Sequence, residues 1–323
     1  MALIKDIKHQ PWLAYLIILD GCTLMLVIFF NVMALGPGVH IGMFKNTTRE
    51  ISEEYSLDIT LPGWTDVLLL LVFIWNGTFI IYSTSNICRR GFGLFIYIAL
   101  SDVLTPFFYT TFLFAMLTNI GWVFAWCYHI LPLAFVFNVA QTTLLCVALL
   151  AVHRCLHTHV TRMSGSQIHD VWLIRILVHN GIAIWTQWIF VNMLINLAQV
   201  MTYSGSVHQD IASTVSLTLF TMDTIGWFLA ENSVLEKYVR FTASNYIINI
   251  TATAAIVAKN CDMGNFSSRN SIFALAVSIM CALMVVCKLV LALWRHRQGS
   301  DSQYDRIMPS TATNSNIVIT IPE

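Results

Sequence analysis

The sequence predicts an all-α fold, a polytopic transmembrane bundle of about eight helices. Of the 323 residues, 57% are apolar and only 11% are charged, whereas an ordinary soluble domain has about 25% charged residues. The mean hydropathy is +0.71, and apolar runs of bilayer-spanning length recur along the chain. This composition excludes a soluble enzyme, and the formal net charge of zero gives no basic surface for nucleic acid.

Eight apolar runs are long enough to cross the hydrocarbon core, which takes about twenty residues. They lie at 12–35, 64–85, 104–127, 131–152, 177–202, 211–230, 241–258 and 271–294. The first run exceeds the length of a signal-peptide core and lacks a small-residue cleavage site, so we expect an uncleaved anchor. The transmembrane bundle therefore occupies 12–294, between an N-terminal segment 1–11 and a polar tail 295–323 that is predicted to be disordered.

An even number of spans places both termini on one side of the membrane. With the N-terminus inside, thirteen lysine and arginine residues fall on inner segments and four (Lys45, Arg49, Lys259 and Arg269) fall outside, as short cytoplasmic loops favour. The glycosylation sequons at Asn46 and Asn265 both fall outside. The sequence thus predicts a glycoprotein of the plasma membrane or another secretory-pathway membrane, with cytoplasmic termini.

The fifth predicted span carries a polar and aromatic stripe. Its members are Trp185, Trp188, Asn192, Asn196 and Gln199, and spacings of three and four residues place them on one helix face. Indoles and amides on one face are typical of a ligand cavity. The same amides are also typical of hydrogen bonds between helices, and the stripe alone leaves both interpretations open.

Asp20, Asp223 and Lys288 lie within predicted spans. Asp20 and Asp223 are costly at membrane depth, so we expect both to be buried inside the bundle. Lys288 lies about two turns from the cytoplasmic end of the last span, and we expect it to extend to the interface. The histidines between 153 and 179 are interpreted as part of a solvated basic patch.

The outer loop between the first two spans is acidic, with Glu50, Glu53, Glu54 and Asp58. We interpret it as a solvated charged loop, with a lid over the bundle as the alternative.

The eight cysteines are scattered singly, and no metal site is expected. Cys127 and Cys261 both fall near the outer side, where an oxidising compartment would allow a disulfide between them. No HExxH, GxSxG or glycine-rich phosphate loop occurs, so an enzyme is not predicted.

Three motifs occur in order along the chain: Leu61-Pro62-Gly63-Trp64 before the second span, Asn119-x2-Trp122 in the third and Trp188-x7-Asn196 in the fifth. Together they resemble the tryptophan-rich sensory protein family, which includes the translocator protein. The resemblance implies a five-helix core with a first loop that caps a pocket for porphyrins, sterol-like and other apolar ligands. It places Trp64, Asn119, Trp122, Trp188 and Asn196 at that pocket.

The resemblance is incomplete around the pocket. The segment after Trp64 lacks the family's further prolines, and Trp75 is displaced, so the lid of the pocket is altered. Residues 60–297 are similar to an eight-span animal group that extends the same core.

These observations predict a membrane protein that binds, senses or transports a small apolar or amphipathic ligand, porphyrin- or sterol-like by resemblance. The expected partners are the lipid bilayer and this ligand, and a homo-oligomer is left open. One alternative is a receptor of the seven-helix type that couples to cytoplasmic partners, although neither an Asp/Glu-Arg-Tyr step nor an Asn-Pro-x-x-Tyr motif is present. The other is a structural membrane protein without a ligand.

Overall fold

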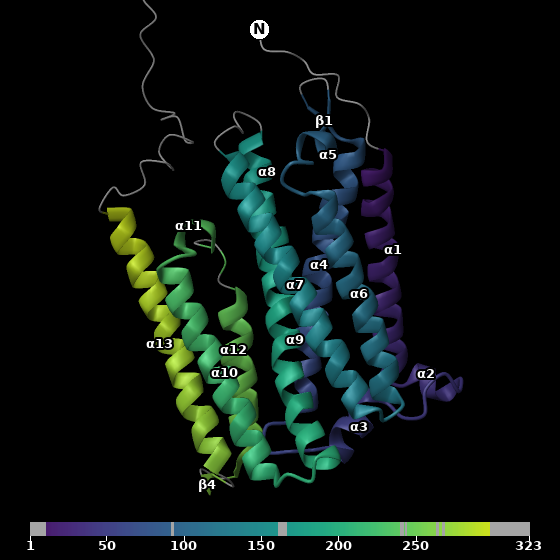
Figure 1. The fold of residues 1–323 in the computed structure, drawn as a ribbon, viewed down its shortest axis with the longest axis vertical. Coiled ribbons are helices and arrows are strands. Elements are labelled where there is room, and N and C mark those ends of the chain that lie inside the picture. The colour runs from purple at the N-terminus through teal and green to yellow at the C-terminus, as the bar shows by residue number, and fades with distance from the viewer. Residues whose placement is uncertain are drawn as a thin grey trace, which may run out of the picture.

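The computed structural model consists of long helices that run side by side, joined by short connections (Figure 1). It describes residues 11–91, 94–160, 167–239, 242, 244–262, 265–266 and 269–297. Within these residues, six helices are long and apolar enough to cross a membrane. They are Pro11–Ala34, Gly63–Cys88, Pro106–Cys127, Leu131–His159, His169–Ser204 and Arg269–Lys288.

Each predicted span corresponds to a long helix of the described chain. These helices are α1 (Pro11–Ala34), α4 (Asp66–Cys88), α6 (Pro106–Cys127), α7 (Leu131–His159), α9 (Asn180–Gln199), α10 (Gln209–Asn232), α12 (Ser244–Asn260) and α13 (Arg269–Arg297). Two of them, α10 and α12, are not among the six, because α12 has only 17 residues and Asp223 with several serines and threonines interrupts α10.

Short elements complete the described chain. They are α2 (Pro37–His40), α3 (Thr48–Glu54), the 3-10 turn η1 (Gly63–Thr65), α5 (Ile96–Ala99), α8 (Gln167–Leu173), α11 (Glu236–Val239) and two hairpins of two-residue strands, β1 (Arg90–Gly91) with β2 (Leu94–Phe95) and β3 (Cys261–Asp262) with β4 (Asn265–Phe266). The first hairpin and α5 lie between α4 and α6. Of the predicted tail, 295–297 belong to α13, and 298–323 lie outside the described residues, as do residues 1–10.

Helix α9 is the central element of the bundle. It continues from α8 through the π-helical turn η3 (Ile174–His179) and into a second π-helical turn, η4 (Val200–Ser204). It contacts α4 and α7 on one side and α10 and α12 on the other. In the most apolar 18-residue stretch of the continuous helix His169–Ser204, 72% of the residues are buried. Helices α1, α4, α6, α7 and α9 form a five-helix group, and α10, α12 and α13 form a three-helix group, as Figure 1 shows.

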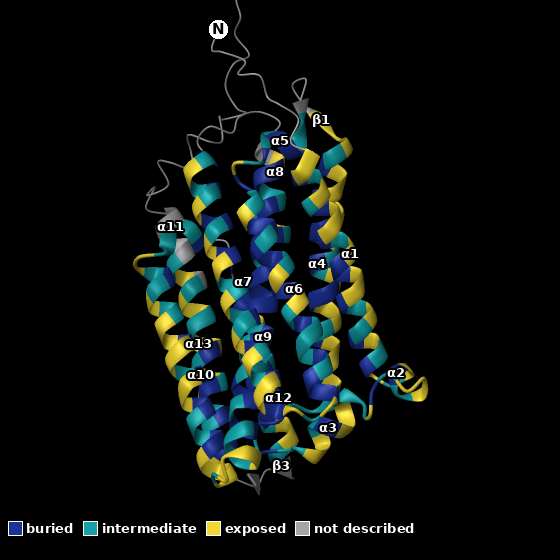
Figure 2. Cartoon of the chain, turned by 45° about the vertical axis from the view of Figure 1, so that its right-hand side comes forward, coloured by how far each residue is buried: buried dark blue, intermediate teal, exposed yellow. Residues whose placement is uncertain are grey.

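The two ends of the bundle differ. Helix α1 begins and α13 ends at the same end, near α8, whereas α3 and β4 lie at the opposite end (Figure 1). We call these the α8 end and the α3 end. The sequon asparagines lie at the α3 end, Asn46 just before α3 and Asn265 in β4. In Figure 2 the exposed residues, drawn in yellow, lie on the outward faces of the helices, as expected where helices meet lipid.

A buried ion pair connects the three-helix group. Lys288 Nζ of α13 lies 2.9 Å from Glu231 Oε2 of α10, and the two side chains are 15% and 2% exposed. The hydroxyl of Tyr246 on α12 donates to Glu231 Oε1 at 2.5 Å, and Lys288 also donates to the Thr242 carbonyl at 2.6 Å. The expectation that Lys288 extends to the interface is therefore wrong, because its partners lie inside the bundle.

Two of the histidines in the predicted basic patch are also buried. The rings of His153 and His179 stack at a centroid distance of 3.9 Å, and each residue is 3% exposed. His153 contacts Thr242 Oγ1 through Nε2 at 3.0 Å. The interpretation of a solvated patch is wrong for this pair, since α7 and α9 enclose both rings.

Helices α4 and α9 approach closely at Gly181. A Cβ atom at this position would lie 2.9 Å from Trp75 Cδ1, while Asn76 Nδ2 donates to the Gly181 carbonyl at 3.0 Å. We expect Gly181→Val to lower the free energy of unfolding by about 1–3 kcal/mol through overpacking. Thermal unfolding of the detergent-purified protein would measure this. Gly77→Val is the matched control, because nothing lies within 4 Å of a Cβ atom at Gly77; equal losses in both variants would contradict the close approach.

Candidate functional site

A network of buried amides lies toward the α3 end of the five-helix group. At its centre, Asn196 Oδ1 of α9 accepts hydrogen bonds from Trp122 Nε1 of α6 at 3.1 Å and from Asn138 Nδ2 of α7 at 2.7 Å. Asn196 Nδ2 donates to Gln199 Oε1 at 2.8 Å. One side chain therefore connects three helices, and its amide uses both its oxygen and its nitrogen.

A second chain of buried amides reaches α1, and the first chain reaches the loop before α4. Asn31 Nδ2 of α1 donates to Asn119 Oδ1 of α6 at 2.9 Å, and Asn119 Nδ2 donates to Gln141 Oε1 of α7 at 3.4 Å. Gln199 Nε2 donates to the Tyr55 carbonyl at 3.1 Å. Each of these amide side chains is at most 8% exposed. Buried amides are favourable only when they are paired, so these contacts fix how the helices align.

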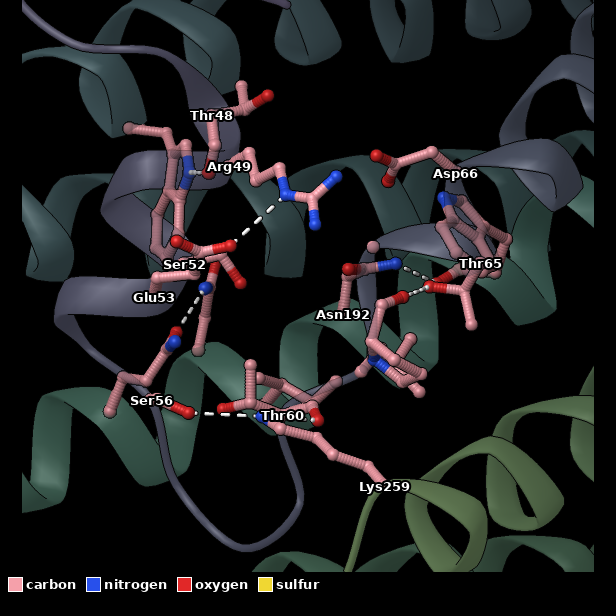
Figure 3. A pocket seen from close by; sticks show the side chains of 18 of the residues that line it. Thr48, Arg49, Ser52, Glu53, Ser56, Thr60, Thr65, Asp66, Asn192 and Lys259 are labelled. Atoms are coloured by element: carbon pink, nitrogen blue, oxygen red, sulfur yellow. Dashed lines mark hydrogen bonds and ion pairs between the residues drawn. The ribbon is translucent and has the colours of Figure 1, made fainter.

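Two adjoining cavities lie beside this network. The first, shown in Figure 3, has a volume of about 200 Å³ and lies between α3, η1, α6 and α9. The second has a volume of about 170 Å³ and lies between α1, α4, α6 and α9. Trp122, Trp188 and Asn192 line both cavities, so a single molecule that passes these three side chains would occupy both.

Aromatic faces form the apolar walls. Trp122 and Trp126 lie one helical turn apart on α6 and stack with a centroid distance of 5.8 Å and an interplanar angle of 14°. Trp188 of α9 lines both cavities. On the side of the second cavity that faces away from the bundle, the wall consists of Val32 of α1, Leu35 just after α1 and Leu70 of α4, which are about half exposed.

The loop between α1 and α4 covers the first cavity. Helix α3 begins with a capping box, in which Thr47 Oγ1 accepts from the Glu50 amide at 3.1 Å and Glu50 Oε2 accepts from the Thr47 amide at 2.8 Å. The hydrogen bonds that Thr47 donates to the Glu50 carboxylate lower the pKa of Glu50. Ile51 of α3 is fully buried, and Trp126 Nε1 donates to the Thr48 carbonyl at 3.3 Å. The acidic side chains of α3 are exposed as expected, but the structure shows the lid arrangement.

Four charged side chains line the first cavity. Arg49 and Glu53 form an exposed ion pair at 3.1 Å. Asp66, at the start of α4, faces both cavities, and Lys259 reaches the first cavity from α12. The site can therefore offer aromatic stacking, amide hydrogen bonds and charges of both signs around one ligand.

Six of the predicted stripe and pocket residues line the cavities: Asn119, Trp122, Trp188, Asn192, Asn196 and Gln199. Trp64 does not; its side chain is 55% exposed, and its neighbours Gly63 and Thr65 line the first cavity instead. Trp185 is fully buried against Phe73 and Phe112 and lines neither cavity. The stripe on α9 thus serves packing at one end and lines the cavities at the other.

The two predicted membrane-depth acids have different surroundings. Asp20 of α1 is fully buried, and neither carboxyl oxygen has a hydrogen-bond partner within the described residues. Asp223 is exposed on α10. The prediction that Asp223 is buried is therefore wrong, because the inward face of α10 carries its neighbours Phe220 and Thr224 instead.

Cys127 is a free thiol, completely buried among Ala34, Phe44 and Val123. The predicted disulfide with Cys261 is not formed in this structure, since apolar side chains enclose the Cys127 sulfur; the side chain of Cys261 lies outside the described set. In the described part of the chain, no three His, Cys, Asp or Glu side chains are grouped to hold a metal ion.

Sequence reasoning missed half of the amide network. Asn31 of α1 and the pair Asn138 and Gln141 of α7 complete it. A signal was present, because Asn138 and Gln141 are three residues apart in an apolar span and so share one helix face. The loop residues Thr48, Arg49 and Ser56 carried no such signal, since their place at the cavity depends on how the loop folds back.

Comparison of the chain with family models, with curated proteins and with solved structures finds no match.

The unpartnered carboxyl of Asp20 gives a prediction for stability. We expect Asp20→Val to raise the free energy of unfolding by about 1–3 kcal/mol, because a buried polar group without a hydrogen bond is replaced by an apolar one. Chemical or thermal unfolding in detergent would measure it. Asp223→Val is the control, and as an exposed change it should shift stability by no more than about 0.5 kcal/mol. A destabilised Asp20→Val protein would show that the carboxyl has a bound partner.

The central position of Asn196 gives a second prediction. Asn196→Ala leaves Trp122 Nε1, Asn138 Nδ2 and Gln199 Oε1 without their partner, and each unpaired buried group costs about 1–3 kcal/mol. We therefore expect a lower unfolding midpoint than for Asn192→Ala, since Asn192 donates only to the Trp188 carbonyl of its own helix. Similar midpoints for the two variants would contradict the central role of Asn196.

Proposed function

We propose that this chain is an eight-span membrane protein that binds a small apolar or amphipathic ligand in the two adjoining cavities at the α3 end. The observation that carries the proposal is the convergence of Trp122, Trp188 and Asn192 on both cavities, beside a network of hydrogen-bonded amides. Concave sites with aromatic walls and a few fixed polar groups are the usual form of small-molecule sites.

The dimensions and walls favour a ligand of modest size. Together the cavities lie at the lower end of the range of about 300–1,000 Å³ that is common for such sites. The first cavity has charged and amide side chains and opens beside the loop, whereas the second has exposed apolar side chains of α1 and α4. This change from a polar first cavity to an apolar second cavity fits an amphipathic molecule with its polar end at the loop and its apolar end toward the lipid.

The exposed wall of the second cavity also supports a route of access. Val32, Leu35 and Leu70 lie where α1 and α4 face the bilayer in the proposed orientation. An apolar ligand concentrated in the membrane would then reach Trp122 and Trp188 sideways, without passing through water. Sensing and transport both begin with this binding step.

We further propose that the five-helix group corresponds to the translocator-protein-like core, with the three-helix group as an extension, and that no catalysis takes place. The shared end of α1 and α13 supports cytoplasmic termini, and the sequons at the opposite end support a secretory-pathway membrane. A porphyrin or a sterol is the first ligand class to test.

We expect the purified protein to be stabilised by at least one apolar probe from a set of protoporphyrin, cholesterol, retinol and dodecanol. A ligand that binds only the folded state at 100 times its Kd stabilises by about 2.7 kcal/mol. In Trp188→Leu the same probe should give a much smaller shift, because the ring that lines both cavities is lost. Thermal unfolding in detergent, with and without each probe, makes the measurement.

Trp12→Leu is the matched control. Trp12 is 52% exposed at the start of α1, at the α8 end and away from both cavities, so this variant should keep the full ligand shift. If no probe stabilises the parent protein, or if Trp188→Leu keeps the full shift, the proposed site is refuted.

A further inference from the structure

The loop that covers the first cavity is held from the three-helix group. Residues 55–62 of this loop connect α3 to η1, and we call them the strap. Lys259 Nζ of α12 donates to Ser56 Oγ at 3.0 Å and to the Thr60 carbonyl at 3.2 Å. Asn260 Nδ2 donates to the Asp58 carbonyl at 2.6 Å, and Asn270 Nδ2 donates to Asp58 Oδ2 at 3.2 Å. The three-helix group therefore forms part of the site.

Lys259 differs from the other cation of the cavity. Arg49 is already paired with Glu53 at 3.1 Å. Within the described residues, Lys259 has no carboxylate within ion-pair distance, and both of its contacts are neutral oxygen atoms. An ammonium group has three N–H donors, so these two contacts leave one donor and the full positive charge for a further partner.

The surroundings of Lys259 agree with a charge that lacks a close counter-ion. Partial burial lowers the pKa of Lys259, and the carboxylates of Asp58 and Glu53 offset this effect only in part. In Figure 3, Lys259 extends along the strap toward Ser56 and Thr60, at the edge of the cavity. An anion bound there would meet a cation that the protein itself does not neutralise by direct contact.

We propose that Lys259 receives the carboxylate of an amphipathic ligand whose apolar part lies against Trp122 and Trp188. This inference rests on the proposed function and names the ligand class, a carboxylate amphiphile. A single negative charge fits better than a polyanion, because Glu53 and Asp66 line the same cavity and would repel additional negative charge. The apolar part then continues past Asn192 into the second cavity.

The test compares two probes with the same alkyl chain, dodecanoate and dodecanol, on the full-length protein in detergent at neutral pH. Titration calorimetry or tryptophan fluorescence gives the two Kd values. We expect the parent protein to bind dodecanoate roughly five- to tenfold more tightly than dodecanol, as a charged hydrogen bond at a partly exposed site allows. Lys259→Gln should remove this preference by weakening the binding of dodecanoate, while Lys259→Arg should keep the preference.

Lys45→Gln is the matched control, because Lys45 is exposed at the same end, lies over the Tyr128 ring and does not line the cavity. This variant should keep the parent preference. Equal Kd values for the two probes in the parent protein overturn the inference, as does a preference that survives in Lys259→Gln. If neither these two probes nor any other apolar probe binds the parent protein, the proposed function itself fails, which is a distinct result.

Discussion

The structure depends on one constraint, that an amide buried between helices is favourable only when it is hydrogen-bonded. In a lipid-facing protein no water is available to satisfy these groups. Asn196 meets the constraint by bonding to α6, to α7 and to Gln199, and the second amide chain adds α1. Apolar contacts alone allow helices to rotate and slide, whereas these directional bonds permit one alignment.

The cavities follow from this alignment. Trp122 gives its indole N–H to Asn196, which fixes the orientation of the ring, and Trp126 stacks on it one turn away. Trp188 lies on α9 two turns before Asn196 and faces the same space. Large rings that are held by hydrogen bonds leave the space between them unfilled, so the network that stabilises the bundle also keeps the two cavities open.

The three-helix group is polar inside for a related reason. Glu231 and Lys288 satisfy each other, and Tyr246 and Thr242 supply the remaining contacts. Removal of one partner from such a buried pair is strongly destabilising, since it leaves a charge without compensation. The pair holds α10, α12 and α13 together, and that unit presents Lys259, Asn260 and Asn270 to the strap. The cover of the cavity thus depends on helices beyond the five-helix group.

The helices, and the face of α9 that carries Trp188, Asn192 and Asn196, could be predicted from the sequence alone. Span length and the spacing of residues along a helix are local properties, and a sequence states them directly. It also indicated Asn119 and Trp122, which line the cavities as the motif suggested.

Which side chains meet across the bundle depends on how the helices pack. Asn31 reaches Asn119 across 88 residues, Lys259 reaches Ser56 across 203, and Glu231 finds Lys288 across 57. The exposure of Asp223 and the enclosure of Cys127 likewise follow from how whole helices rotate and pack. Helix rotation is set by the sum of all contacts between helices, and no local pattern in one span specifies it.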